Sequence, residues 1–230
     1  MTSLESSRDI GETIEESEFV EQYLIEYGRS KRCRLIQIGA NEGKHEYAKL
    51  TGKDFVFEFL KQNKNWEAVL VEPIPYIFER LKENYSLHEA DITFLNCAIS
   101  EHVEKRVFNI DGKEGKKSHL APIGEGREKF DDTIEVQCIP YSLIQELVNW
   151  DSVDCVKIDA EGYDEHIVGQ IISASEKADL PKFILWEQIG PEKENTSDKL
   201  RALGYSTYRT GRAKNGIWMD IVGIHSSVIL

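Results

Sequence analysis

Acidic side chains directly follow several short apolar runs of this chain. Glu72 comes after the run AVLV, Asp159 and Glu161 follow DCVKI, and Glu187 follows KFILW. If these runs are parallel strands, the acids lie at the carboxyl edge of the sheet, where open α/β sheets bind their ligands. Crowded carboxylates raise one another's pKa, which suits a general base. Asp159, Glu161 and Glu187 can also hold a divalent cation such as magnesium.

Other titratable residues have two interpretations each. Asp164 and Glu165 either join the acids before them or simply favour the start of a helix through its dipole. His119, in the polar stretch KKSHLAP, is either a catalytic or substrate-binding group or a solvated loop residue. His45, just after IGANEGK, is a further candidate base. The candidate catalytic residues are Asp159, Glu161, Glu187 and His119.

A glycine-bearing turn, IGANEG, follows the apolar run RLIQI. Gly39 and Gly43 permit tight backbone geometry and close approach of a ligand. Their spacing is G-x-x-x-G, which differs from the dinucleotide pattern G-x-G-x-x-G. Glu72, as an acid ending the second strand, can accept hydrogen bonds from the ribose hydroxyls of an adenosine. The turn and Glu72 together predict a nucleoside-bearing cofactor, either NAD or S-adenosylmethionine.

The elements that must position these residues alternate along the chain. Apolar spacing predicts strands over residues 34–38, 68–71, 92–95, 154–158 and 182–186. Helical spacing is found over residues 18–27, 75–85, 142–148 and 163–175, and KDFVFEFLKQN predicts an additional helix. Such alternation is typical of a parallel sheet with helices on both faces. Two further strands around TGRAKNG predict an antiparallel hairpin at the edge of that sheet.

The domain organisation follows from the same pattern. We expect an acidic segment and a helix over residues 1–30 and a single domain over residues 31–230, since no Pro-, Gly- or Ser-rich linker divides them. Residues 101–137 contain a polar, glycine-rich stretch between the candidate strands RVFNI and TIEVQCI. This stretch predicts a loop insertion of the kind that forms lids or binding loops.

The composition of the chain indicates which partners it binds and in which cellular compartment we expect it. The chain carries 41 acidic and 28 basic residues, a net charge of −13, so its field repels phosphate and disfavours nucleic acid or anionic membrane. We see no run near the roughly 18 apolar residues of a spanning helix and no apolar segment of a signal peptide. The four cysteines lack C-x-x-C spacing and are expected to be buried thiols. We therefore expect a cytoplasmic protein that acts on a small molecule.

Five sequence blocks, in this order, resemble one known family. They are RLIQIGANEGK, AVLVEPIPYIFERLKENY, ITFLNCAIS, VDCVKIDAEGYDEHIV and ILWEQ, from about Arg34 to Gln188. They resemble the FkbM family of S-adenosylmethionine-dependent methyltransferases, most specifically in E-P-x-P-x-x-F-x-x-L-K-x-N and K-I-D-x-E-G. The resemblance implies a class I methyltransferase fold. That fold is α/β and Rossmann-like, with a mostly parallel seven-stranded sheet, an antiparallel C-terminal strand and helices on both faces.

The resemblance also implies a cofactor site. The implied contacts are Gly39, Ala40 and Asn41 for the methionine part, Glu72 for the ribose, Pro73 and Ile74 for the adenine faces, and Asn96, Cys97 and Ala98 for the adenine edge. Gln37 departs from the family, which often has aspartate at this position. An amide accepts a hydrogen bond but cannot offset the positive charge of the cofactor, and Asp159 can supply that negative charge instead.

The resemblance implies methyl transfer to a small-molecule acceptor, in the first place a hydroxyl oxygen of a sugar or natural-product intermediate. Three alternatives stay open. The first is N-methylation of a peptide or amine. The second is a nicotinamide-dependent oxidoreductase, against which the missing G-x-G-x-x-G counts. The third is a non-catalytic cofactor-binding module that kept the fold. No feature of the sequence specifies an oligomeric state.

Overall fold

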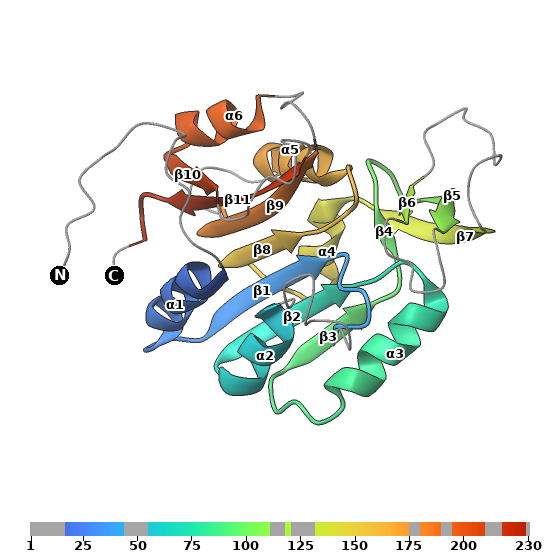
Figure 1. The fold of residues 1–230 in the computed structure, drawn as a ribbon, viewed down its shortest axis with the longest axis horizontal. Helices are drawn as coiled ribbons and strands as arrows, with labels where there is room; N and C mark the ends of the chain where they lie inside the picture. Colours follow the sequence, from blue (N-terminus) through green and yellow to red (C-terminus); the bar gives the residue numbers. More distant parts are fainter. Residues whose placement is uncertain are drawn as a thin grey trace.

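A seven-stranded sheet, called the main sheet, forms the centre of the molecule (Figure 1). The computed structural model describes residues 17–43, 55–110, 118–120, 132–174, 180–189, 195–209 and 218–228. The strands of the main sheet, in spatial order, are β10 (Tyr205–Arg209), β11 (Trp218–His225), β9 (Phe183–Ile189), β8 (Cys155–Ile158), β1 (Cys33–Ile38), β2 (Trp66–Val71) and β3 (Ile92–Leu95). Strand β11 runs antiparallel to β9 and β10, while the other neighbours pair in parallel. The predicted fold class is confirmed, including the C-terminal hairpin at the sheet edge.

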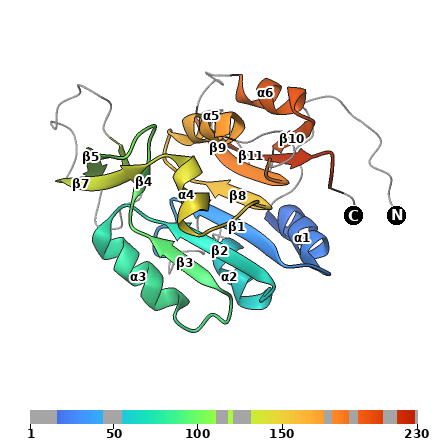
Figure 2. The ribbon, with the colours of Figure 1, turned by 180° about the vertical axis from the view of Figure 1, so that it is seen from behind.

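Helices cover both faces of the main sheet (Figure 1 and Figure 2). One face packs against α1 (Ser17–Gly28), α2 (Phe55–Gln62) and part of α3 (Pro75–Tyr85). The other packs against α4 (Tyr141–Leu147), α5 (Asp164–Ala174) and α6 (Thr196–Ala202). Side chains alternate along a strand, so Leu35 and Leu70 face the first group of helices and Ile36 and Val69 face the second.

The central strands are buried on both faces, which explains why they read as continuous apolar runs. The helix predicted over residues 75–85 and the strand predicted over residues 92–95 have the expected bounds. The helix predicted in KDFVFEFLKQN is confirmed as α2, which covers FVFEFLKQ. All four cysteines are free and buried, as expected. No helix in the described part of the chain is long and apolar enough to cross a membrane.

A second sheet, called the small sheet, lies beyond the carboxyl ends of β1 and β2 (Figure 1). Its strands, in spatial order, are β4 (Ala98–Ile99), β7 (Asp132–Ile139), β5 (Glu104–Ile110) and β6 (His119–Leu120). Phe108, Val136 and Cys138 pack against Ile74 and Ile77 at the start of α3. The candidate strands RVFNI and TIEVQCI are confirmed as parts of β5 and β7, which pair with each other and bury one apolar face. Residues 111–117 and 121–131 lie outside the described residues.

Asp154 joins three elements at the amino end of β8. Its Oδ1 accepts a hydrogen bond from the Tyr27 hydroxyl of α1 at 2.6 Å, and its Oδ2 accepts the Arg34 main-chain N–H of β1 at 2.9 Å. Its main-chain carbonyl accepts the N–H of Phe183 at the start of β9. One carboxylate therefore fastens the first helix to the centre of the main sheet.

We expect Asp154→Ala to lower the free energy of unfolding by about 2–4 kcal/mol, measured by urea denaturation. The substitution leaves a partly buried hydroxyl and a main-chain N–H without their acceptor, and both bonds are charge-assisted. Asp151→Ala is the matched control, because Asp151 also contacts Arg34 but from a fully exposed position. We expect only a small effect for Asp151→Ala. Equal losses in the two variants would contradict the assignment.

Candidate functional site

Four carboxylates and one glycine lie in a row along the carboxyl edge of the main sheet. The strand register places Glu72, after β2, and Asp159, after β8, on either side of Gly39. Glu187 of β9 comes next to Asp159, and it pairs directly with Asp220 of β11. By strand alternation, these positions belong to the face covered by α1 and α2. We call these four carboxylates the acid row.

The acid row contains three of the predicted site residues and one that sequence reasoning missed. Glu72, Asp159 and Glu187 were expected, although β9 continues to Ile189, so Glu187 lies within its strand and not after it. Asp220 was missed because it belongs to the terminal hairpin, and its proximity to Glu187 follows only from the register.

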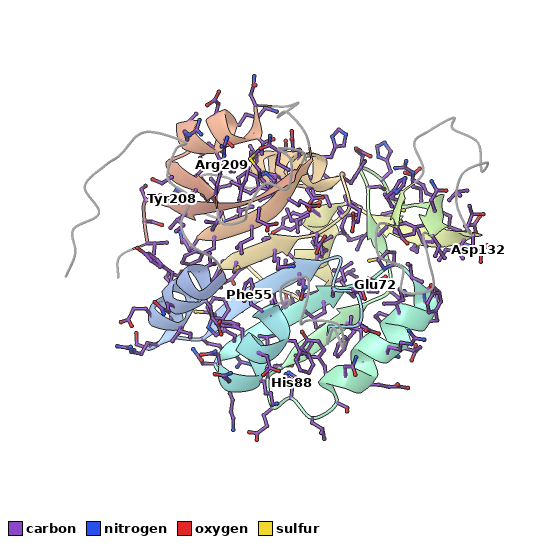
Figure 3. All side chains as sticks on the ribbon, in the orientation of Figure 1. Phe55, Glu72, His88, Asp132, Tyr208 and Arg209 are labelled. Atoms are coloured by element: carbon purple, nitrogen blue, oxygen red, sulfur yellow. The ribbon has the colours of Figure 1, made fainter. Side chains whose placement is uncertain are left out.

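Glu72 is held rigidly in the interior. Its Oε2 accepts the main-chain N–H of Asn41 at 2.9 Å, and its Oε1 accepts the main-chain N–H of Ile74 at 2.9 Å. Burial raises the pKa of Glu72 to about 7, and the two N–H donors act in the opposite direction. Figure 3 shows Glu72 at the end of β2, on the side of the small sheet. Each carboxylate oxygen has a second lone pair, so both oxygens can also accept a ribose hydroxyl.

The turn after β1 is curled by residues with positive φ angles. Gly39 has φ 77°, Asn41 has φ 49° and Gly43 has φ 72°. A Cβ atom at Gly39 would lie 1.9 Å from the main-chain oxygen of Asp159. Gly39 is therefore required by the close approach of the backbone after β8, in addition to any ligand. His45 lies outside the described residues.

The other predicted cofactor residues lie next to Glu72. The Asn96 side-chain amide donates to the main-chain oxygens of Glu72, at 2.8 Å, and Pro73, at 3.1 Å, and so joins the ends of β2 and β3. The Ile74 and Ala98 side chains are buried in the core of the small sheet. Contacts of these two residues with a ligand would therefore run through the backbone. The remaining members also lie at this edge: Ala40 and Cys97 are buried there, and Gln37 lies fully buried on β1.

Asp164 is a buried link between α5 and β9. It is 1% exposed, and it accepts the main-chain N–H groups of Ala160 at 3.2 Å and Glu187 at 3.1 Å. Burial, and then repulsion from Asp159, raises the pKa of Asp164 to about 7. These bonds join the turn after β8 to the strand that carries Glu187. Glu165, its neighbour, accepts a hydrogen bond from Thr196 of α6 at 3.4 Å.

Asp164 makes stability depend on pH. Its pKa rises from about 3.8 in the unfolded chain to about 7 in the folded protein. Between these values the folded state holds the extra proton, so the free energy of unfolding falls as pH rises, by up to about 1.4 kcal/mol per pH unit. We expect Asp164→Asn to flatten this slope between pH 5 and 7 in urea denaturation series. The exposed Asp198→Asn should leave the slope unchanged, and parallel curves for Asp164→Asn and the parent would refute the assignment.

The turn that carries Glu161 is tightly closed. Glu161 has φ 49° and Gly162 has φ 95°, and the Tyr163 N–H donates to the Ala160 carbonyl at 3.2 Å. The Tyr163 hydroxyl donates to Glu101 of the segment before β5 at 2.7 Å. The turn is thereby tied to the small sheet.

Glu187 is the acid most affected by its neighbours. Burial raises its pKa to about 8, and the negative charges of Asp159, Asp164, Glu161 and Asp220 act in the same direction. This environment favours a carboxyl group that takes up a proton near neutral pH.

Two further expectations concern His119 and the metal. The structure places His119 on β6, an edge strand of the small sheet, beside Asn109 of β5, and not in the acid row. Within the described ranges, no group of three or more His, Cys, Asp or Glu residues is placed to hold a metal ion. The magnesium site predicted at Asp159, Glu161 and Glu187 therefore gains no support.

The main sheet has the strand order of the class I methyltransferase fold, with a single antiparallel strand beside its edge. The acid after β2, next to a glycine turn, also belongs to this fold. A family model described as the methyltransferase FkbM domain matches residues 37–207. The chain therefore belongs to the FkbM methyltransferase family, which confirms the resemblance seen in its sequence.

The chain is similar to several solved structures at low sequence identity. The METTL16 MTase domain is 11% identical, with a TM-score of 0.51, over 90% of this chain and 66% of that one. The precorrin-6y C5,15-methyltransferase from Geobacter metallireducens GS-15 is 13% identical, with a TM-score of 0.45, over 96% of this chain and 94% of that one. The human methyltransferase 10 domain containing protein is 11% identical, with a TM-score of 0.49, over 96% and 91%. No curated protein matches the chain.

Proposed function

We propose that this protein transfers a methyl group from S-adenosylmethionine to a small-molecule acceptor, in the first place to a hydroxyl oxygen of a sugar or natural-product intermediate. The observation that carries the proposal is the environment of Glu72. This residue is a buried acid in a chain of the FkbM family, held by two main-chain N–H groups beside the turn at Gly39. Such a rigid acceptor suits the paired hydroxyls of a ribose.

The residues around Glu72 fit the cofactor. The turn over residues 39–41 would hold the methionine part, Glu72 the ribose, and the backbone at residues 73–74 and 96–98 the adenine. When bound, S-adenosylmethionine supplies a methyl group on a positively charged sulfur, which is a good leaving group. The protein has mainly to align the acceptor with that methyl group.

A hydroxyl acceptor must also lose its proton, and we assign Glu187 to accept it. The raised pKa of Glu187, about 8, lies near working pH, as a general base requires. Asp159 and Glu161 flank the same region and would orient the hydroxyl. The small sheet lies beyond this edge and would cover the acceptor (Figure 1).

Calorimetric titration tests the cofactor assignment. We expect micromolar binding of S-adenosylmethionine and of its demethylated product, S-adenosylhomocysteine, and no heat from NAD. Binding of NAD alone would favour an oxidoreductase. The absence of binding heat with all three ligands would overturn the proposal.

We expect Glu161→Ala to lower turnover by about 10–1,000-fold, the range of a positioned catalytic group, while its affinity for S-adenosylhomocysteine changes less than about threefold. The assay is release of S-adenosylhomocysteine with an acceptor found in a substrate panel. Glu83→Ala, on the exposed side of α3, is the control and should keep parent turnover. Parent turnover in Glu161→Ala would remove this residue from the mechanism.

An amine acceptor is the second candidate, favoured by the charge of the acid row. Asp159, Glu187 and Asp220 lie on adjacent strands and would attract an ammonium group. The acceptor panel should therefore contain sugars, phenols, amines and peptides. Turnover of amines alone would replace the hydroxyl assignment, whereas cofactor binding with no turnover would favour a non-catalytic module.

A further inference from the structure

Lys157 lies on β8 directly beneath the acid row. The register places it between Gln37 of β1 and Leu185 of β9, and it precedes Asp159 by two residues, so both side chains belong to the same face. Its side chain is 16% exposed, and its Nζ lies 3.8 Å from Asp159 Oδ2. Sequence reasoning missed Lys157 because it stands inside an apolar strand.

The surroundings of Lys157 explain how a mostly buried ammonium is tolerated. Burial of a charge is costly unless opposite charges lie nearby. Asp159 supplies one such charge, and Asp220, two strands away, also interacts electrostatically with Lys157. Gln37, the neighbour on β1, is fully buried and uncharged.

The cofactor of the proposed function presents opposite charges to this region. The methionine part of S-adenosylmethionine carries a sulfonium, an ammonium and a carboxylate. The acid row can balance the two cationic groups, but the carboxylate requires a cation. Lys157 is the cation that the register places beneath the row, beside the turn at Gly39.

We propose that Lys157 binds the carboxylate of the cofactor's methionine part and links it to Asp159. This inference rests on the proposed function. The 3.8 Å between Lys157 and Asp159 is an ion-pair distance, longer than a direct hydrogen bond. An ammonium has three N–H donors and can serve two carboxylates together.

The same arrangement bears on Gln37, at a position where the family resemblance implies aspartate. An aspartate at position 37 would lie beside Lys157 in the register and compete with the ligand carboxylate for the ammonium. The neutral amide adds no further negative charge beside the ammonium. Among the described residues, one rival cation is Arg80 of α3, which lies 3.8 Å from Glu42 in the turn after β1 and is 53% exposed.

The test compares S-adenosylmethionine with decarboxylated S-adenosylmethionine, which differs from it only in lacking the carboxylate. Calorimetry with the parent protein should show a preference of about 10–100-fold for the carboxylated ligand, the range of one charge-assisted bond. Lys157→Met should remove the preference, and its affinity for the decarboxylated ligand should change less than about threefold. Lys157→Arg should retain most of the preference. This variant takes the place of Lys157→Met in the test if Lys157→Met does not fold.

Lys105→Met is the control, because Lys105 is an exposed lysine paired with Glu135 at 3.0 Å, and it should keep the parent preference. Equal losses for both ligands in Lys157→Met would overturn the inference, as would loss of the preference in Arg80→Met instead. Equal affinity of the parent for both ligands would overturn it and leave the proposed function intact. A parent that binds neither ligand would overturn the proposed function and this inference with it.

Discussion

Glu72→Ala will weaken the binding of S-adenosylhomocysteine by about 100-fold or more. Glu72 is 4% exposed, and its carboxylate is held by two main-chain N–H groups. Replacing this fixed acceptor by a mobile water therefore costs binding free energy. Two charge-assisted hydrogen bonds to a ribose, at about 1.5 kcal/mol each, correspond to roughly a hundredfold change in affinity. Calorimetric titration of folded protein measures the loss directly.

Two further variants test the same prediction. Glu79→Ala removes an exposed acid of α3 that pairs with Lys82 at 2.7 Å, and it should bind the ligand as the parent does. Glu72→Gln keeps the shape of the side chain but has one acceptor oxygen where the carboxylate has two, so its affinity should be intermediate. Parent affinity in Glu72→Ala would remove the ribose assignment and, with it, the main support for the proposed function.

Gly39→Ala will lower the free energy of unfolding by about 3 kcal/mol or more and will abolish binding of S-adenosylhomocysteine. A φ of 77° costs a residue with a side chain about 1–2 kcal/mol. The new Cβ would also lie 1.9 Å from the main-chain oxygen of Asp159, so the ends of β1 and β8 must separate. Overpacking of this kind adds about 1–3 kcal/mol. Urea denaturation and calorimetry measure the two effects.

Gly223→Ala is the matched control for Gly39→Ala. Gly223 lies within β11, and a Cβ atom there would lie 3.3 Å from the Tyr205 ring, so the ring would have to shift by only a few tenths of an ångström. We expect a much smaller loss of stability in Gly223→Ala and unchanged ligand binding. Similar losses in both variants would show that the close approach of the Asp159 backbone is not what requires glycine at position 39.

Both predictions concern one edge of the main sheet. Gly39 lies between Glu72, which the proposed function assigns to the ribose, and Asp159, Glu187 and Asp220, which it assigns to the acceptor. The turn at Gly39 is therefore the point where cofactor and acceptor groups would meet.

The amino-acid sequence by itself was sufficient for the fold class, the family and most of the elements. Continuous apolar runs and helical repeats near 3.6 residues are local properties of a segment. They predict the elements correctly because the same side chains that create the pattern form the core. The run KDFVFEFLKQN became α2, and PYIFERLKENY became α3, for this reason. Glu72 was also recognised as a candidate site residue from the sequence. An acid directly after an apolar run can be found without knowing which strands lie beside that run.

Tertiary structure alone decided which residues lie side by side. Asp220 is adjacent to Glu187, and Lys157 lies next to Gln37, through the order and register of strands far apart in the chain. The sequence left two interpretations of Asp164 open, and only the structure shows that it is buried and bonded to the main chain of β9. The candidate strands RVFNI and TIEVQCI were visible in the sequence, but their pairing with each other and their packing against the start of α3 follow only from the tertiary structure. Long-range pairing depends on the whole chain, whereas the periodicity of a segment depends only on its own residues.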